Sequence, residues 1–358
     1  MKKLKVAIIG QGRSGKDIHG TFFLSDRNQW YDVAYVVDMD ERRRNVSLER
    51  YPGCQAFADY RELFDIDDID LVVNATYSYM HYAITKDLLE HGFNVLVEKP
   101  FARNQFECSD LINTAKKHNV LLAVFQQTFF APYYQDALRL IKEGKFGTVR
   151  QISIRFNAFA RRWDWQTMQK MMGGNAYNTG PHPFGMALGF LDFDDNAKVV
   201  YSKLANTLMS SGDSDDYCKM IIEAPNKPII DLEINNTECY SGYNIKIQGD
   251  KGCYKSTPTA YEYRYIVDGE NVERPLIETS LQDEKGNPIY CSEKLVVHEE
   301  KGTYNGTAFD VGTQKLYEDV YYAITEGKKL YIDSEKVKKI IGVIEIAHAQ
   351  NDLPYIFD

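Results

Sequence analysis

The sequence lacks the features that mark several other classes of protein. It has no apolar run of about 18 residues, the length that a membrane-spanning helix needs. Its six cysteines are scattered without a C-x-x-C pair, which is typical of free thiols in a reducing compartment. Its formal net charge is −9, whereas a nucleic-acid-binding surface normally carries a basic stripe. We therefore expect a cytoplasmic protein that binds neither a membrane nor nucleic acid.

Metal ligands and a hydrolytic serine are also missing. The seven histidines are dispersed, and none has a ligand spacing with a cysteine, so we expect no metal site. No G-x-S-x-G elbow is present. The basic start of the chain is followed by only four apolar residues, Val6–Ile9, before a glycine turn, which indicates a strand and not a signal peptide.

Two domains are expected, because 358 residues exceed what one core usually supports. Residues 1–125 alternate short apolar runs with helical patterns, which predicts a doubly wound parallel sheet of the Rossmann type. Residues 126–358 are rich in strands joined by tight turns, which predicts a large, mostly antiparallel open sheet. We expect the helix near Ser334–Gln350, with Ser334 as its cap, to pack back toward the first domain.

The expected strands follow from these patterns. In the first domain they are Val6–Ile9, Val33–Val37, Leu71–Asn74, Asn94–Val97 and Leu121–Phe125. In the second domain they are Val149–Phe156, Tyr217–Glu223, Ile229–Ile234, Asn244–Gln248, Tyr261–Val267 and Lys294–His298.

A G-x-G-x-x-G turn follows the first strand and opens a helix, as a dinucleotide site requires. Its residues are Gly10, Gln11, Gly12, Arg13, Ser14 and Gly15. A diphosphate would lie at the helix N-terminus, where unpaired N–H groups and the helix dipole favour an anion. The alternative is an ordinary glycine-rich surface turn.

An acid follows at the expected distance. Asp38 ends the second strand and is placed to bind the ribose 2′-hydroxyl of an adenosine. Its carboxylate would repel a 2′-phosphate and so favours NAD, while Arg42 and Arg43 nearby leave NADP possible.

Charged residues end the fifth strand, beside the expected cofactor crevice. They form the block Glu98-Lys99-Pro100, and functional groups gather at the carboxyl ends of parallel strands. A plain surface turn is the alternative interpretation.

The ordered set of motifs resembles the Gfo/Idh/MocA oxidoreductases over nearly the whole chain. The glycine turn, the segment from Asn74 to His81, the Glu98-Lys99-Pro100 block and the segment from Gly173 to His182 match family patterns in order. The resemblance implies an NAD(P)-dependent enzyme that acts on sugars, inositols or related polyols.

The resemblance also implies residue roles. Lys99 would be the catalytic lysine beside the nicotinamide, and His182 the histidine that moves the substrate proton. Ala75, Thr76 and Glu98 would line the nicotinamide side of the cofactor pocket, and we include His81 in this set. A cis Lys99–Pro100 bond is also expected.

Two positions depart from the family pattern. Asn178 stands where members have an aspartate, and Gly185 where many have an acid. An asparagine can orient a histidine but cannot carry a proton. We therefore predict that Lys99 and His182 move the proton while Asn178 positions substrate or histidine.

The segment 161–166 alternates aromatic with polar side chains, which suits a sugar or polyol. We expect Arg162, Trp163 and Trp165 to bind substrate, with Gln127 and Tyr177 as weaker candidates beside Asn178 and His182. A lid or a subunit contact is the alternative role of this segment.

The open face of the second sheet is expected to be covered, because many of the 25 tyrosines fall on its strands and family members commonly pair there. This predicts a homodimer or homotetramer. Two other functions stay open: a redox-neutral, NAD-dependent enzyme that cleaves glycosides, and a non-catalytic regulator that senses the cofactor.

Overall fold

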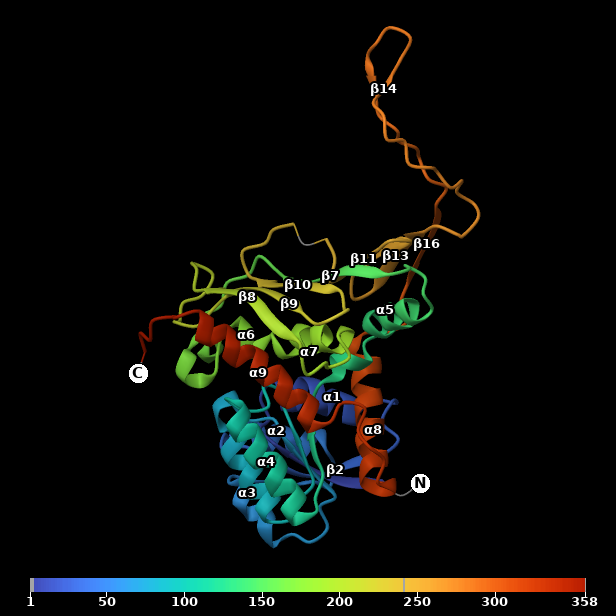
Figure 1. Ribbon diagram of the computed structural model, residues 1–358. Coiled ribbons are helices and arrows are strands. Elements are labelled where there is room, and N and C mark those ends of the chain that lie inside the picture. The colour runs from blue at the N-terminus through green and yellow to red at the C-terminus, as the bar shows by residue number, and fades with distance from the viewer. Residues whose placement is uncertain (1–2, 241, 358) are drawn as a thin grey trace.

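The computed structural model describes residues 3–240 and 242–357. Figure 1 shows the N-terminal sheet and its helices on one side of the molecule, the large second sheet on the other, and a thin arm that leaves the second sheet. Within the described residues, no helix combines the length and the apolar character needed to cross a membrane.

The first sheet has six parallel strands in the order β3-β2-β1-β4-β5-β6. They are β1 Leu4–Ile9, β2 Tyr31–Val37, β3 Gln55–Phe57, β4 Leu71–Asn74, β5 Val95–Val97 and β6 Leu122–Val124. The strand order changes direction between β1 and β4, the place where open parallel sheets bind ligands. The prediction of a Rossmann sheet is confirmed, although β3 was missed because this short edge strand has no buried residue.

Short helical segments connect these strands. They are η1 Arg13–His19, α1 Gly20–Phe23, α2 Glu41–Arg50, η2 Tyr60–Asp65, η3 Ser78–Met80, α3 His81–Glu90 and α4 Gln105–His118. The helix that leaves the glycine turn begins with the wide π-type winding of η1 and continues as α1. Such π segments are frequent at functional sites.

The second sheet has eight strands in the order β16-β13-β12-β11-β7-β10-β9-β8. They are β7 Val149–Asn157, β8 Lys198–Ala205, β9 Tyr217–Glu223, β10 Ile229–Asn235, β11 Ile245–Gly249, β12 Gly252–Ser256, β13 Ala260–Tyr265 and β16 His298–Thr303. Only the β7–β10 pair is parallel among these neighbours. The mostly antiparallel sheet is therefore confirmed.

Helices α6 Asn175–Asn178 and α7 Pro181–Phe190 lie against one face of this sheet (Figure 1). The other helical segments of this part of the chain are η4 Gln127–Phe130, α5 Pro132–Lys142, η5 Trp165–Thr167 and η6 Gln169–Met171. Every second residue of β9 and β10 is buried beneath α6 and α7, as expected for a sheet covered on one face.

One expected strand was misplaced, and the strands β8 and β12 were missed. The expected strand Lys294–His298 begins only at His298, because the residues before it belong to the exposed arm. The strand β12 was missed, since Tyr254 is its only large apolar residue and pairing with both β11 and β13 is what defines it.

The C-terminal helices lie against the first sheet and its helices. They are η7 Ala308–Gly312, α8 Thr313–Glu326 and α9 Ser334–Gln350. Leu316 and Tyr317 of α8 share an apolar core with Ile8 of β1, and the Gln105 N–H of α4 donates to Glu345 of α9 at 3.0 Å. Segments from the end of the chain thus pack onto the N-terminal sheet and its helices. The domain boundary near residue 125 stays a prediction.

The cap of α9 differs from the expected one. The side chain of Asp333 accepts the Lys336 N–H at 2.9 Å, so Asp333 and not Ser334 is the N-cap.

Replacing Asp333 with alanine should lower the free energy of unfolding by about 1 kcal/mol, because the first turn of α9 loses its acceptor. Ser334→Ala is the matched control, and we expect it to change this free energy by less than about 0.5 kcal/mol. Urea unfolding measures both. Equal losses from the two substitutions would contradict the observed cap.

Candidate active site and cofactor cleft

The glycine turn is packed tightly on one side and open on the other. Gly10 has a φ of +90°, and a β-carbon there would lie 2.6 Å from the Ala75 carbonyl oxygen. A β-carbon on Gly15 would lie 1.8 Å from the Gly10 carbonyl oxygen. At Gly12, the nearest atom to such a carbon is Nη1 of Arg43, at 4.0 Å. The turn therefore leaves room for a phosphate to approach the backbone at Gly12.

The start of η1 offers unpaired donors beside this space. Its N-cap, Gly12, has no side chain to cap the first turn. Gln11 is only 4% exposed, yet neither its amide nitrogen nor its amide oxygen has a partner among the described residues. Arg13 is exposed and Ser14 is half-buried in the first turn. Free N–H groups and an orphaned buried amide fit the diphosphate and ribose of a dinucleotide.

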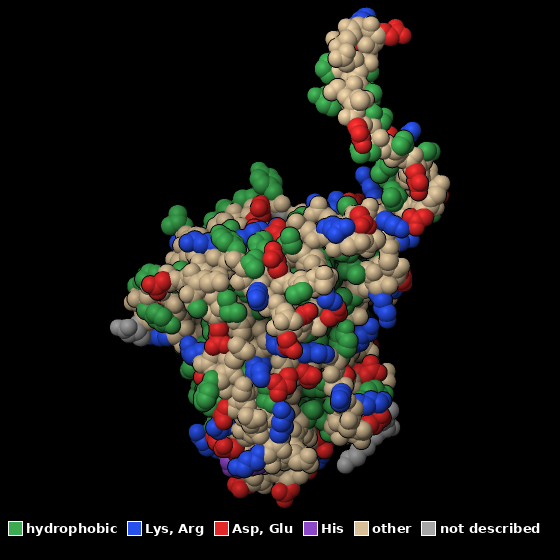
Figure 2. All heavy atoms as spheres, viewed as in Figure 1, with side chains coloured by type: hydrophobic (Ala, Val, Ile, Leu, Met, Phe, Trp, Pro, Cys, Tyr) green, Lys and Arg blue, Asp and Glu red, His purple; other side chains and the backbone are tan. Residues whose placement is uncertain are grey.

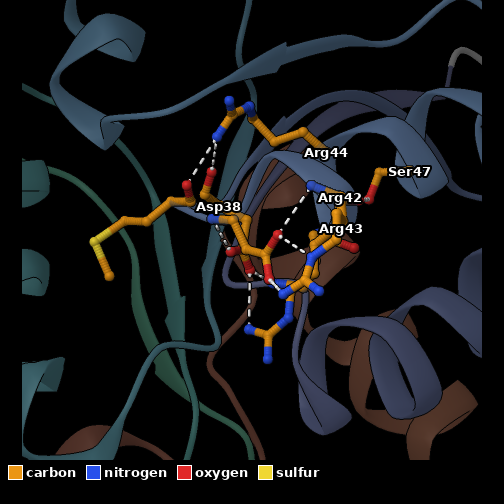
Figure 3. Close-up of polar contacts among 8 residues, drawn as sticks. Asp38, Arg42, Arg43, Arg44 and Ser47 are labelled. Carbon is orange, nitrogen blue, oxygen red and sulfur yellow. Dashed lines mark hydrogen bonds and ion pairs between the residues drawn. The ribbon is translucent and has the colours of Figure 1, made fainter.

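Asp38 follows β2 and makes several polar contacts with its neighbours (Figure 3). Its Oδ2 accepts the Gln11 N–H at 2.7 Å and lies 3.5 Å from Nη1 of Arg43. Its Oδ1 accepts the Asp40 N–H at 2.9 Å. The carboxylate therefore fixes the glycine turn, and its contact with a ribose stays a prediction.

Three arginines lie near Asp38, and Arg43 is the one paired with its carboxylate. Arg44 donates to the Asp38 carbonyl oxygen at 2.8 Å, and Arg42 pairs with Asp40 at 3.1 Å. Arg43 is the one that lies closest to the opening over Gly12. Its guanidinium is half-exposed and can turn toward a 2′-phosphate.

The ends of β4 and β5 are joined by a buried histidine. Nδ1 of His81 lies 2.7 Å from the Pro100 carbonyl oxygen, and Nε2 lies 3.2 Å from that of Thr76. Burial lowers the pKa of His81, and a neutral ring can donate to only one of these two carbonyl oxygens. His81 thus lies between the Thr76 segment and the cis Lys99–Pro100 bond.

Glu98 forms a buried network that sequence reasoning missed. Its Oε1 lies 3.1 Å from Nε2 of His19, whose Nδ1 lies 2.7 Å from the Tyr317 hydroxyl. Burial alone would raise the pKa of Glu98, but His19 and the charge of Lys99 bring it to about 2. The carboxylate is therefore ionised near neutral pH, and α8 helps to hold it through Tyr317.

Lys99 bridges the two halves of the chain. Its ammonium donates to the Asn178 carbonyl oxygen at 2.7 Å. Burial lowers the pKa of Lys99, the charge of Glu98 opposes this, and the charges of Arg162 and Arg13 lower it further. Groups from the glycine turn and from the second half of the chain thus act on the same ammonium.

His182 lies within electrostatic reach of Lys99. Burial and then the charge of Lys99 lower the pKa of His182 to about 3, so its ring is neutral at physiological pH. Its Nδ1 lies 3.1 Å from the hydroxyl of Thr128. If Nδ1 carries the hydrogen and donates to Thr128, Nε2 is free to accept a proton.

The structure shows what surrounds Asn178 and Gly185, the two positions that depart from the family pattern. The Asn178 side chain accepts a hydrogen bond from Gln166 at 2.9 Å, and Gln166 in turn pairs with Arg162. A β-carbon on Gly185 would lie 2.9 Å from the Phe129 ring, so α7 has no room for an acid there.

The other residues that we expect to bind substrate differ in their exposure and in their contacts. Trp165 meets Tyr77 edge to face, with ring centroids 5.0 Å apart, while Trp163 is 77% exposed. Gln127 is buried and its amide oxygen has no partner among the described residues. Tyr177 points elsewhere, because its hydroxyl donates to the Arg103 carbonyl oxygen and its ring stacks on His348.

The described residues contain no group of three or more His, Cys, Asp or Glu side chains that could hold a metal ion. The glycine turn lies near Lys99, since the charge of Arg13 acts on the Lys99 ammonium, and this combination is typical of a dinucleotide-binding enzyme. The chain belongs to the Gfo/Idh/MocA oxidoreductases. The family's NAD-binding Rossmann fold matches residues 4–126, and its C-terminal alpha/beta domain matches residues 139–351. The protein is thus an oxidoreductase with an NAD(P)-binding domain.

Relatives and solved structures agree with this family. The chain is 26% identical to scyllo-inositol 2-dehydrogenase (NADP(+)) IolW of Bacillus subtilis, over 96% of this chain and 92% of that one. It is 22% identical to 2,7-anhydro-N-acetylneuraminate hydratase of Mediterraneibacter gnavus, over 81% of this chain and 77% of that one. A 3-ketoreductase from Actinomadura kijaniata, solved with NADP and TDP-benzene, superposes with a TM-score of 0.77 at 15% identity, over 97% of this chain and 98% of that one.

Asp38→Ala should weaken the affinity for NAD by about 1.5–3 kcal/mol, the scale of a hydrogen bond to a charged group. The loss has two sources, because the carboxylate faces the ribose and also holds the Gln11 N–H. Titration calorimetry with NAD measures it. An unchanged affinity would remove Asp38 from the cofactor site.

Proposed function

We propose that this enzyme transfers hydride between NAD(P) and a secondary alcohol or ketone of a sugar, inositol or related polyol. The observation that carries the proposal is the desolvated pair of Lys99 and His182, beside a turn built for a diphosphate. The nicotinamide, when bound, supplies the hydride chemistry. The protein must then bind the alcohol, orient it and move its proton.

Each of these tasks has a residue. Nε2 of His182 accepts the hydroxyl proton, because the ring is neutral at physiological pH. The Lys99 ammonium stabilises the charge that develops on the oxygen, and its bond to the Asn178 carbonyl fixes where it points. Gln166 and Arg162 hold the Asn178 side chain, which positions the substrate.

The cofactor preference belongs to the same proposal. Asp38 favours NAD, because both of its oxygens accept hydrogen bonds and its charge faces the ribose. Arg43 beside Gly12 allows NADP as a second cofactor. We place the enzyme in the cytoplasm on the ground of its scattered cysteines.

A redox-neutral reaction is the second candidate. The observation that favours it is the relative named as a hydratase, whose reaction is without net oxidation, together with Asn178 in place of an acid. A tightly retained nucleotide, with no net change in the absorbance of the reduced nicotinamide during turnover, would favour this candidate over the first.

We also propose that the chain forms a homodimer or homotetramer. An arm between β13 and β16 leaves the body, and its strands β14 Leu281–Gln282 and β15 Pro288–Ile289 pair in a sheet of their own (Figures 1 and 2). Leu276 and Tyr290 of this arm are 84% and 87% exposed. Isolated two-stranded hairpins are marginal in water, which supports a second copy of the chain as the surface that the arm packs on.

The first test is a screen of sugars, inositols and sugar acids with NAD and NADP, followed by the absorbance of the reduced nicotinamide. Lys99→Ala and His182→Ala should each lower turnover by at least about 100-fold, because each removes a proton-transfer or charge-stabilising group. The midpoint of thermal unfolding in both variants is the control for folding. Turnover that survives both substitutions would refute the mechanism.

Replacing residues 270–295 with Gly-Ser should convert the oligomer into a smaller species, because the arm's apolar side chains lose their partner surface. Sedimentation velocity at micromolar concentration measures the mass. The matched control is Glu284→Ser with Lys285→Ser at the exposed tip of the arm, which should leave the mass unchanged. A wild-type monomer, or an oligomer that survives the deletion, would contradict this role of the arm.

A further inference from the structure

The imidazole of His182 has a hydrogen-bond partner that the motifs did not indicate. Its Nδ1 lies 3.1 Å from the hydroxyl of Thr128, a residue 54 positions earlier in the chain. The side chain of Asn178 instead accepts a hydrogen bond from Gln166 at 2.9 Å, and its carbonyl oxygen accepts one from Lys99 at 2.7 Å. The position where family members have an aspartate therefore serves other groups in this chain, and a threonine meets the ring.

Thr128 is well fixed for this contact. It lies in η4, shortly after the end of β6, and it is 5% exposed. Its carbonyl oxygen accepts the Ala131 N–H at 3.1 Å, and α5 begins directly afterwards at Pro132. A buried hydroxyl on a fixed backbone needs a polar partner, and the imidazole is that partner.

Glycines in α7 allow η4 to come close enough to reach His182. A β-carbon on Gly185 would lie 2.9 Å from the ring of Phe129, and one on Gly189 would lie 3.4 Å from it. The two glycines are one helical turn apart on the same side of α7, and Phe129 follows Thr128 in η4. An acid at Gly185 would collide with Phe129 and push η4 away, so this departure from the family pattern and the threonine contact belong together.

We propose that Thr128 is a positioning residue that holds His182 with its hydrogen on Nδ1 and the lone pair of Nε2 toward the reacting hydroxyl. A threonine hydroxyl can donate or accept, and only when it accepts from Nδ1 is Nε2 free to take the substrate proton. That proton moves from the substrate oxygen to Nε2, while the Nδ1–H stays on Thr128 in a bond that the new positive charge strengthens. The inference rests on the proposed function, because it assigns the support of the proton acceptor.

A hydroxyl in this place acts differently from a carboxylate. A carboxylate beside the ring would stabilise the imidazolium and raise its pKa, whereas the hydroxyl of Thr128 carries no charge. Burial and the charge of Lys99, opposed by Glu98, lower the pKa of His182 to about 3. Thr128 therefore sets the direction of the ring and leaves it neutral, ready to accept a proton at physiological pH.

The direct test observes the two ring nitrogens of His182 in the full chain labelled with nitrogen-15 histidine. Two-bond proton–nitrogen spectra near neutral pH distinguish a protonated ring nitrogen from one with a lone pair, and the signals that His182→Ala lacks assign the ring. We expect the hydrogen on Nδ1 in the wild type. Thr128→Val removes the hydroxyl at nearly constant volume and should move both nitrogen signals toward those of a mixture of tautomers. Thr128→Ser should keep the wild-type signals.

Turnover gives a second readout with any polyol that the substrate screen finds. Thr128→Val should lower kcat by at least about tenfold with KM little changed, as part of the roughly 100-fold or more that a positioned base supplies. Thr128→Ser should restore most of this kcat. Thr114→Val is the matched control, because Thr114 is a buried threonine of α4 whose hydroxyl donates to the Asp110 carbonyl oxygen at 2.8 Å. It should change neither the ring signals nor kcat, and the midpoint of thermal unfolding in each variant reports folding.

Asn178→Ala separates the two candidates for this role, because it keeps the carbonyl oxygen that binds Lys99 and should leave the ring signals in place. Ring signals that move with Asn178→Ala but not with Thr128→Val would overturn the proposal, and so would a hydrogen on Nε2 in the wild type. Turnover that needs Lys99 and His182 but is unchanged in Thr128→Val would overturn it while leaving the proposed function in place. A ring held by Thr128 as expected, without hydride transfer to or from any polyol, would keep the contact and reject the proposed function.

Discussion

The hydrogen bond from the Lys99 ammonium to the Asn178 carbonyl oxygen is the contact on which the account depends. It joins the end of β5 to the short helix α6, which begins beneath the second sheet. Burial lowers the pKa of Lys99, and the charge of Glu98 opposes this shift. A lysine that is charged, desolvated and fixed in direction can stabilise an oxygen anion at a single place. Arg13 of the glycine turn and His182 both interact electrostatically with this lysine.

Much of the fold was readable from the sequence, because the Rossmann half has strong local signals. Continuous apolar strands, a glycine turn that needs a positive φ, and an acid at the end of β2 all act over short stretches of chain. The elements that the sequence did not predict correctly have different causes. The strands β3 and β12 have few apolar residues and are defined by their neighbours. The cap of α9 was misplaced by one residue, because aspartate and serine are adjacent and equally suitable.

The candidate site was predictable in its reactive groups but not in what supports them. Lys99 and His182 came from ordered motifs, whereas His19 and Tyr317 gave no signal. His19 meets Glu98 across 79 residues and Tyr317 across 298 residues, and pairings over such separations are decided by the fold alone. Thr128 gave no signal for the same reason, since it meets His182 across 54 residues, where η4 packs on α7. The contacts of Tyr177 with Arg103 and His348 were equally out of reach of sequence reasoning.

The central claim is that the Lys99 and His182 cleft exchanges hydride between a nicotinamide and a polyol carbon. The most direct measurement incubates the enzyme and NAD(P) with polyols deuterated at carbon, and then determines the mass of the recovered nucleotide. A redox-neutral reaction returns the label to the substrate and leaves the recovered nucleotide unlabelled, so this readout tests net hydride transfer, the first candidate. The account predicts deuterium on the nicotinamide with the wild-type enzyme and none with Lys99→Ala. A nucleotide that stays unlabelled with every polyol would contradict it.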